Sequence, residues 1–122
     1  MNNLRVKLLF VTCLCLAISA KSQIQVGAAD TSSYLYLLNE KRVAVVANPT
    51  SMVGDKHLIP FLIDKGVQLK EIFALEHGIY GNADAGAQIK DGVDDRSGLP
   101  VYSLYGSNKK PKPEQLQDID IV

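Results

Sequence analysis

The 122-residue sequence contains no tryptophan and only two cysteines. Cys13 and Cys15 both fall in an uncharged run near the N-terminus, so the rest of the chain has no cysteine. A chain of that kind can form no disulfide and no cysteine-based metal site outside its first fifteen residues. Its stability must therefore come from packing of an apolar core, for which about 100 residues are enough.

The N-terminal segment has the features of a secretory signal peptide. Arg5 and Lys7 precede the uncharged run 8–19, and small residues follow it. The apolar part, residues 8–18, is shorter than the roughly 20 residues that span a bilayer. We expect cleavage after Ala20 or Ser22, a periplasmic or secreted product formed by residues 23–122, and no stable membrane insertion. The residues before the two cysteines make a poor lipobox.

The sequence also lacks an excess of positive charge. Its 13 basic residues equal its 13 acidic ones, and removing the segment that holds Arg5, Lys7 and Lys21 leaves 10 basic against 13 acidic residues. A mildly acidic product is a poor candidate for nucleic-acid binding. The chain has no G-x-G-x-x-G, Walker or H-E-x-x-H motif. We therefore expect no metal and no other cofactor, and we interpret His57 as a capping or surface residue.

The alternation of apolar runs with turn residues predicts an α/β fold. Residues 43–47 form an apolar run typical of a parallel-sheet strand covered on both faces, and residues 67–74 form a second one. Between them, after Asp55, apolar residues recur at helical spacing, with Pro60 in the first turn or at a kink and Gly66 as a C-terminal cap. Strand, helix and strand in this order make a βαβ unit.

Further elements are predicted on both sides of this unit. Thr31 can cap a helix that ends at Asn39, and residues 101–104 form a third strand. A short helix over 113–117 precedes an apolar strand that begins at 119. Because domains seldom end inside a central strand, we expect the chain to be truncated at Val122.

Polar side chains follow each of the three predicted strands. Because the loops after parallel strands gather at one edge of the sheet, where ligands bind, these side chains should share one crevice. The first loop carries Asn48, Thr50 and Ser51, the second carries Glu76, His77, Asn82 and Asp84, and the third carries Tyr105, Gly106 and Asn108.

The second loop has the chemistry of a sugar-processing site. A glutamate at position 76, beside Phe73 and Leu75, should be partly desolvated, which raises a carboxyl pKa toward that of a general acid. His77 could instead hold this carboxylate ionised. The amide and carboxylate of the same loop offer the donors and acceptors that sugar hydroxyls need. From the residues alone, a Glu-His pair can equally be a cap or salt bridge, and the hydroxyl residues of the first loop can simply cap a turn.

Three motifs, "KRVAVVANPTS", "FALEHGIYGNADAG" and "GLPVYSLYG", in this order resemble the exo-β-N-acetylmuramidases of the NamZ type. The resemblance implies a Rossmann-like parallel sheet with flanking helices, of which residues 23–122 would be an incomplete N-terminal part. It implies an exported glycosidase that releases N-acetylmuramic acid from the non-reducing ends of peptidoglycan fragments. The implied partners are muramyl saccharides, and no cofactor is implied.

The resemblance also assigns roles to residues. Glu76 and His77 would be catalytic, and the substrate-binding residues would be Asn48, Thr50, Ser51, Asn82 and Asp84. Because glycosidases usually need a second carboxylate about 5 to 10 Å from the first, and none is assigned here, we expect the fragment to be inactive alone.

Two positions depart from the family pattern. Tyr80 stands where the family commonly has arginine, and Ala87 where an acidic residue is frequent. Both changes bear on how the lactyl group of muramic acid is held. The rival readings are a periplasmic, non-catalytic sugar-binding module and an extracytoplasmic structural or interaction domain.

Overall fold

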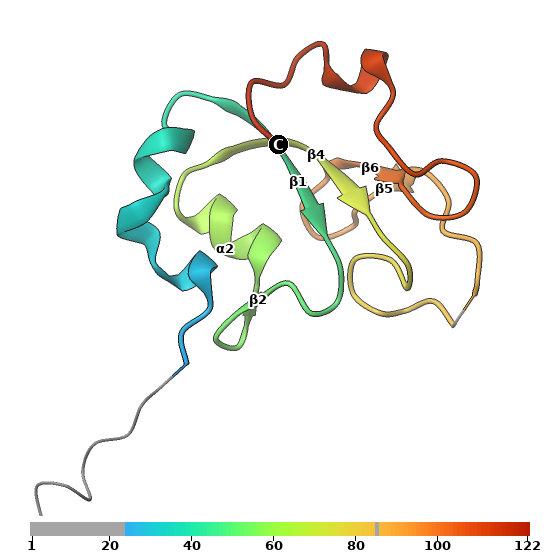
Figure 1. The fold of residues 1–122 in the computed structure, drawn as a ribbon, viewed down its shortest axis with the longest axis horizontal. Coiled ribbons are helices and arrows are strands. Elements are labelled where there is room, and N and C mark those ends of the chain that lie inside the picture. The colour runs from blue at the N-terminus through green and yellow to red at the C-terminus, as the bar shows by residue number, and fades with distance from the viewer. Residues whose placement is uncertain (1–23, 85) are drawn as a thin grey trace, which may run out of the picture.

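A four-stranded, mostly parallel sheet forms the centre of the computed structural model, which describes residues 24–84 and 86–122 (Figure 1). The predicted signal peptide, its cleavage sites and both cysteines lie outside the described residues. The sheet order is β1 (Arg42–Ala47), β4 (Gln68–Ala74), β6 (Pro100–Ser103) and β5 (Gly92–Val93). The first three strands run parallel, as predicted, but β5 pairs antiparallel with β6. The predicted parallel α/β sheet is therefore confirmed for its three predicted strands, and β5 is an additional edge strand that was not predicted.

The predicted βαβ unit is confirmed, with α2 (Leu58–Asp64) connecting β1 to its parallel neighbour β4. Pro60 lies in the first turn of α2, where a missing N–H costs nothing, and Gly66 follows the helix with a φ of 78°. His57 caps the helix, because its Nδ1 accepts a hydrogen bond from the backbone N–H of Ile59 at 3.4 Å. The capping interpretation of His57 is confirmed, whereas the surface one is wrong, because this residue is only 8% exposed.

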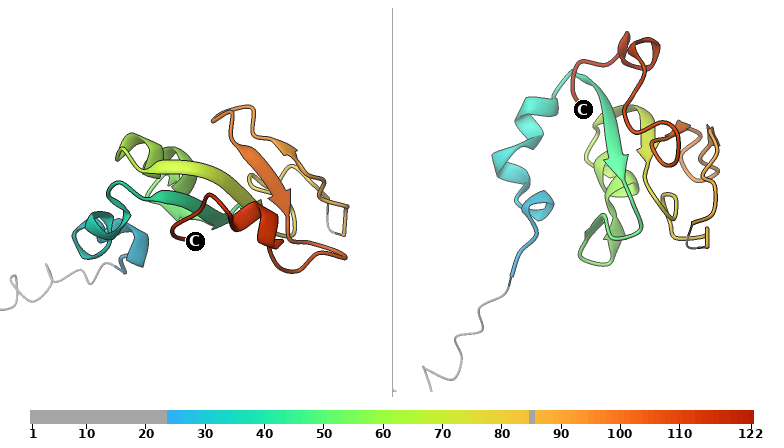
Figure 2. Two further views of the ribbon diagram at one scale, coloured as in Figure 1. Left: turned by 90° about the horizontal axis from the view of Figure 1, so that it is seen from above. Right: turned by 45° about the vertical axis from the view of Figure 1, so that its right-hand side comes forward.

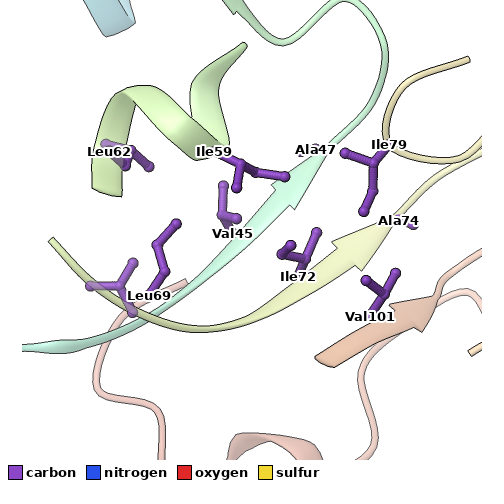
Figure 3. Packing of buried hydrophobic residues seen from close by; sticks show 10 residues of the cluster. Val45, Ala47, Ile59, Leu62, Leu69, Ile72, Ala74, Ile79 and Val101 are labelled. Atoms are coloured by element: carbon purple, nitrogen blue, oxygen red, sulfur yellow. The ribbon is translucent and has the colours of Figure 1, made fainter. Parts of the chain in front are cut away.

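The main core lies between α2 and one face of the sheet (Figure 3). Ile59 and Leu62 point from the helix toward Val45 of β1 and Ile72 of β4. These helix side chains are 0% and 4% exposed, and burying each contributes roughly 1.5–3 kcal/mol. Alternate residues of β1 share this face because strand side chains alternate between faces. Packing against α2 therefore holds β1 and β4 side by side, with their carboxyl ends at the same edge of the sheet.

The other face of the sheet is covered less completely. The segment that contains the 3₁₀ helix η4 (Pro113–Leu116) lies on this side, opposite α2 (Figure 2, left). Phe73 is fully buried there, but Val46 is 41% exposed, so the prediction that β1 is covered on both faces was wrong for this residue. Glu71 is also buried, and its Oε1 has no hydrogen-bond partner in the described part of the chain. Burial raises the pKa of the Glu71 carboxyl.

The N-terminal segment forms 3₁₀ turns, and the predicted helix from Thr31 to Asn39 was wrong in type. After η1 (Gly27–Ala29), the chain forms η2 (Thr31–Ser33) and η3 (Leu35–Leu38). Hydroxyl side chains compete for backbone groups in this segment, because the Ser33 hydroxyl donates a hydrogen bond to the Asp30 carbonyl at 2.8 Å. No α-helix therefore propagates through it.

A short hairpin that the sequence analysis missed precedes α2. It pairs β2 (Met52–Val53) with β3 (Lys56–His57), and Gly54 takes a φ of 59° in its turn. Strands of two residues have too little alternation to be detected in a sequence.

The C-terminal residues lie along the free edge of β1. Of the predicted strand at 119–122, the structure forms one parallel bridge, between Val43 and Ile121. Arg42 holds this segment through ion pairs with Asp118 at 2.9 Å and Asp120 at 2.8 Å. The hydrogen bond from Arg42 lowers the pKa of the Asp120 carboxyl. Across residues 24–84 and 86–122, none of the helices has the length and apolar character needed to cross a bilayer.

Candidate functional site

The loops that follow β1, β4 and β6 meet at the carboxyl edge of the sheet. A Cβ atom built on Gly81, in the second loop, would lie 3.3 Å from Cγ of Pro49 in the first. In the same way, the hydroxyl of Tyr105 in the third loop donates a 2.7 Å hydrogen bond to Oε1 of Glu76 in the second. The loops therefore meet as predicted, but their polar side chains do not share one crevice: Thr50 and Asn108 line separate clefts.

The three predicted site residues of the first loop bond mainly to one another. Asn48 Oδ1 accepts hydrogen bonds from the Thr50 N–H at 3.1 Å, the Thr50 hydroxyl at 2.9 Å and the Ser51 hydroxyl at 3.1 Å. The backbone N–H of Asn48 donates in return to Ser51 Oγ at 3.1 Å. The turn-capping interpretation is thus confirmed, whereas substrate contact stays a prediction. Thr50 also lines a cleft with residues 24–26, separate from the cleft described below.

His57 connects the first loop to the second. Its Nε2 lies 3.0 Å from the Asn48 carbonyl oxygen, and because Nδ1 accepts from α2, Nε2 carries the proton and donates. The edge of the ring packs against Tyr80 with centroids 4.9 Å apart and an interplanar angle of 64°. One buried imidazole therefore positions the helix start and both loops.

A tight turn directly after β4 carries the two predicted catalytic residues. The Gly78 N–H donates to the Leu75 carbonyl at 3.0 Å, and His77, the third residue of this turn, has a φ of 67°. Glycine or asparagine normally takes this position, and another side chain in the left-handed region costs roughly 1–2 kcal/mol. Such strain is concentrated at functional sites. Nδ1 of His77 lies 3.3 Å from the Ala83 carbonyl, and the side chain forms no ion pair with Glu76.

Glu76 is exposed, which contradicts the predicted desolvation of its carboxylate by Phe73 and Leu75. The physical reason is local: Phe73 is buried within the sheet, whereas the turn that starts at Leu75 directs the glutamate away from that layer. Its contact is polar instead, because the Tyr105 hydroxyl donates to Oε1. This hydrogen bond is the main cause that raises the pKa of Tyr105. The described residues thus hold Glu76 in place without enclosing it.

A cleft of about 370 Å³ lies beside this turn, within the range of roughly 300–1,000 Å³ for small-ligand sites. Its apolar lining includes Ile79, Ile89 and Val101. Of the predicted site residues, His77 and Asn82 line it. Asp84 is exposed, and its carbonyl accepts from Ala87 at 3.0 Å within the loop.

Tyr80 is the most constrained polar side chain of the cleft. Its hydroxyl donates a 3.3 Å hydrogen bond to Oδ2 of Asp94, and the Arg96 guanidinium lies 4.0 Å above its ring. Burial, with the nearby Asp94 carboxylate, raises the pKa of the Tyr80 hydroxyl. Asp94 is buried and also accepts from Ser97 N–H at 3.0 Å and Ser97 Oγ at 2.5 Å.

Asp94 and Arg96 were not predicted as site residues, because the segment "DDRSGLP" indicates only a turn. An arginine followed by a serine and a glycine gives no signal of a tyrosine sixteen residues earlier. Within the described ranges there is no cluster of three or more His, Cys, Asp or Glu side chains that could hold a metal ion.

Comparisons with known proteins identify one family to which the chain is similar. Residues 43–122 match the family described as "Exo-beta-N-acetylmuramidase NamZ, N-terminal". The chain is 37% identical over 106 residues to the peptidoglycan beta-N-acetylmuramidase NamZ of Bacillus subtilis (strain 168), covering 84% of this chain and 25% of that protein.

Solved structures of DUF1343 family proteins are also similar to this chain. A DUF1343 family protein of Bacteroides fragilis NCTC 9343 superposes with a TM-score of 0.65 at 33% identity, over 82% of this chain and 25% of that one. A second such protein from the same strain gives 0.62 at 36% identity, over 75% and 23%. The mostly parallel sheet is compatible with a Rossmann-like α/β domain, and the chain spans about a quarter of the length of these relatives.

Proposed function

The chain belongs to the NamZ N-terminal family, a family of cell-wall glycosidases, and we propose that it is the N-terminal part of an exo-β-N-acetylmuramidase. The whole protein would release N-acetylmuramic acid from the non-reducing ends of peptidoglycan fragments. Residues 23–122 would supply part of the catalytic domain and would be inactive alone, because the chain spans a quarter of its relatives.

The observation that carries the proposal is the position of Glu76. Its carboxylate lies at the edge of the sheet where ligands of open α/β folds bind, and Tyr105 fixes one of its oxygens at 2.7 Å. In glycosidases one carboxylic acid protonates the departing glycosidic oxygen while a second carboxylate acts on the sugar ring. Glu76 would be the acid. Enclosure by the substrate and by other parts of the whole protein would supply the desolvation that a general acid needs.

The neighbouring cleft is the proposed sugar site. Its apolar lining suits the face of a sugar ring, while His77 and Asn82 offer polar groups for hydroxyls and the N-acetyl group. His77 in its strained conformation would be held ready for this contact. Asn48, Thr50, Ser51 and Asp84 would join only by releasing or supplementing hydrogen bonds within their own loops.

The proposal is tested on the whole protein with the disaccharide in which N-acetylmuramic acid is β-linked to N-acetylglucosamine, because a sugar leaving group needs protonation to depart. Glu76→Gln keeps the shape and the contact with Tyr105 but cannot donate a catalytic proton, so turnover should be lost while binding persists. Glu114→Gln, at an exposed position in η4, is the matched control and should leave turnover unchanged. Turnover by Glu76→Gln near the wild-type rate would refute the assignment.

The exposure of Glu76 favours one alternative, a non-catalytic sugar-binding module. The same assay separates the two functions. Saturable binding of N-acetylmuramic acid by the wild-type whole protein, without hydrolysis of the disaccharide, would favour the module over the enzyme.

The proposal also includes export. The signal-like residues at the N-terminus support a periplasmic or secreted enzyme, which is the compartment of its peptidoglycan substrate. Mass spectrometry of the mature N-terminus should find cleavage after Ala20 or Ser22. An intact Met1 on a cytoplasmic product would contradict this part.

A further inference from the structure

Arg96 is an exposed residue whose guanidinium lies at the cleft beside His77. Its guanidinium lies 4.0 Å from the centroid of the Tyr80 ring and lines the same cleft. Stacking uses the flat face of a guanidinium, so its N–H groups remain directed outward in the plane. Within the described ranges Arg96 takes part in no ion pair. The cleft lining also holds the carboxylates of Asp94 and Asp95 and a second cation, Lys90. Oδ2 of Asp94 is engaged by Tyr80 and Ser97.

The ring beneath Arg96 is itself held from two sides. The Tyr80 hydroxyl is anchored on buried Asp94 at 3.3 Å, and His57 packs its edge against the ring at 4.9 Å. His57 is in turn fixed by hydrogen bonds at both ring nitrogens. A cation on a rigid platform loses less conformational entropy on binding a ligand than a free surface arginine does. The arrangement is therefore preorganised for an anion.

The backbone delivers Arg96 to this place through the antiparallel edge of the sheet. Pairing of β5 with β6 closes a turn in which the Asp94 N–H donates to the Leu99 carbonyl at 2.9 Å, and the Gly98 N–H donates to the Asp94 carbonyl at 2.7 Å. The turn carries the guanidinium over the second strand-end loop. This explains why the one antiparallel pair in a parallel sheet lies next to the cleft.

We propose that Arg96 binds the carboxylate of the lactyl group and so selects N-acetylmuramic acid over N-acetylglucosamine. This inference rests on the proposed function. The two sugars differ by this lactyl ether, which carries the only negative charge of the muramic acid unit. A guanidinium pairs with a carboxylate through two parallel N–H···O bonds, which gives both energy and orientation. Arg96 would act on specificity and leave proton transfer to Glu76.

The test compares two substrates in the whole protein: aryl β-N-acetylmuramide with a free lactyl carboxylate, and the same compound with a neutral lactyl carboxamide. Arg96→Ala should raise KM for the carboxylate about tenfold, at the lower end for hydrogen bonds to charged groups because the site is open. KM for the carboxamide and kcat for both substrates should change little. Arg96→Lys, which keeps the charge without the fork, should recover part of the loss.

Lys65→Ala is the matched control. Lys65 also lies over an aromatic ring, 5.6 Å from the centroid of Phe61, but it belongs to the C-terminal end of α2 and not to the cleft. This variant removes one positive charge and one cation–π contact and should leave the preference for the carboxylate intact. A KM that rises equally for both substrates in Arg96→Ala, or for neither, would overturn the role of Arg96.

The two proposals fail in different ways. If the wild-type protein hydrolyses neither substrate, the proposed function and the role of Arg96 both fall. If it hydrolyses both, and Arg96→Ala keeps the wild-type preference for the carboxylate, only the role of Arg96 is refuted.

Discussion

Replacing His57 by alanine should destabilise the protein far more than its position in a two-residue strand suggests. This side chain is 8% exposed and has a partner on each side of its ring. Nε2 bonds the Asn48 carbonyl at 3.0 Å, Nδ1 accepts from Ile59 at 3.4 Å, and the ring edge contacts Tyr80. The substitution removes all three contacts at once.

The magnitude follows from those contacts. The helix cap is worth about 0.5 kcal/mol, the low end of its range, because the 3.4 Å bond is long. A net hydrogen bond adds about 1 kcal/mol. An edge-to-face aromatic pair adds roughly 0.5–1.5 kcal/mol beyond the area it buries. Since neighbouring contacts do not add exactly, we expect a loss of about 2–3 kcal/mol in the free energy of unfolding.

Urea denaturation followed by circular dichroism measures this loss. With an m value of about 1–3 kcal/mol/M, the midpoint should fall by roughly 0.7–3 M. His57→Asn keeps a capping oxygen but cannot reach Asn48 or Tyr80, so it should recover only the cap. Lys56→Ala, one residue earlier, removes an ion pair with Asp64 between two exposed side chains and should cost at most about 0.5 kcal/mol.

Two results would refute the reasoning. A loss in His57→Ala no larger than in Lys56→Ala would mean that the buried contacts contribute nothing. Full recovery in His57→Asn would assign the whole effect to the helix cap and would remove the link between α2 and the two loops.

Three further predictions concern charge and backbone. Burial raises the pKa of Glu71 above its ordinary value of 4.5, so the folded state binds a proton more tightly than the unfolded state. The free energy of unfolding should therefore fall as the pH rises from the unfolded pKa to the folded one. Urea midpoints of Glu71→Gln should lack this decline, and a parallel decline would contradict it. Arg42 lowers the pKa of Asp120, so its small, salt-screened contribution should be present above about pH 4 and lost on acidification. Asp120→Asn should lack that loss, and an unchanged acid profile would disprove the coupling. Gly81→Ala combines a φ of 77° with a 3.3 Å contact to the proline of the first loop, whereas Gly54→Ala has a φ of 59° and open space. In thermal melts, both variants should lose roughly 1–2 kcal/mol of stability from backbone strain, and Gly81→Ala should lose more because of the proline contact. Equal losses in the two variants would contradict a contribution from that contact.

The βαβ unit could be predicted because its signals are local. The apolar runs of β1 and β4 and the helical spacing of α2 each lie within one segment, so the strands begin within one residue of the predicted starts. Gly66 and Pro60 take the roles that their backbone restrictions dictate. The prediction of an α-helix at the N-terminal turns was wrong because it used apolar periodicity alone. Serine hydroxyls compete for backbone groups there, and the spacing of apolar residues carries no information on those contacts.

Part of the candidate site could likewise be predicted from the sequence, and part could not. Parallel topology alone brought the three strand-end loops together, and the contacts of Gly81 with Pro49 and of Tyr105 with Glu76 confirm it. The environment of Glu76 could not be predicted, because it depends on the turn in which His77 takes a positive φ. A side chain two residues past a buried strand can face the core or the solvent, and the backbone conformation of the turn decides which.

The position of Arg96 at the cleft could not be predicted from local sequence patterns. Its partner Tyr80 is distant in the chain, and the two meet because a two-residue antiparallel strand pairs with β6 and folds a turn back over the second loop. Open α/β sheets bind ligands at the carboxyl ends of their parallel strands, and Glu76 could be proposed from the sequence for that reason. The proposed selection among sugars would depend on a turn at the sheet edge, where insertions and substitutions cost little stability. We therefore expect substrate preference in this family to vary with residues 94–99 while the turn that carries Glu76 is kept.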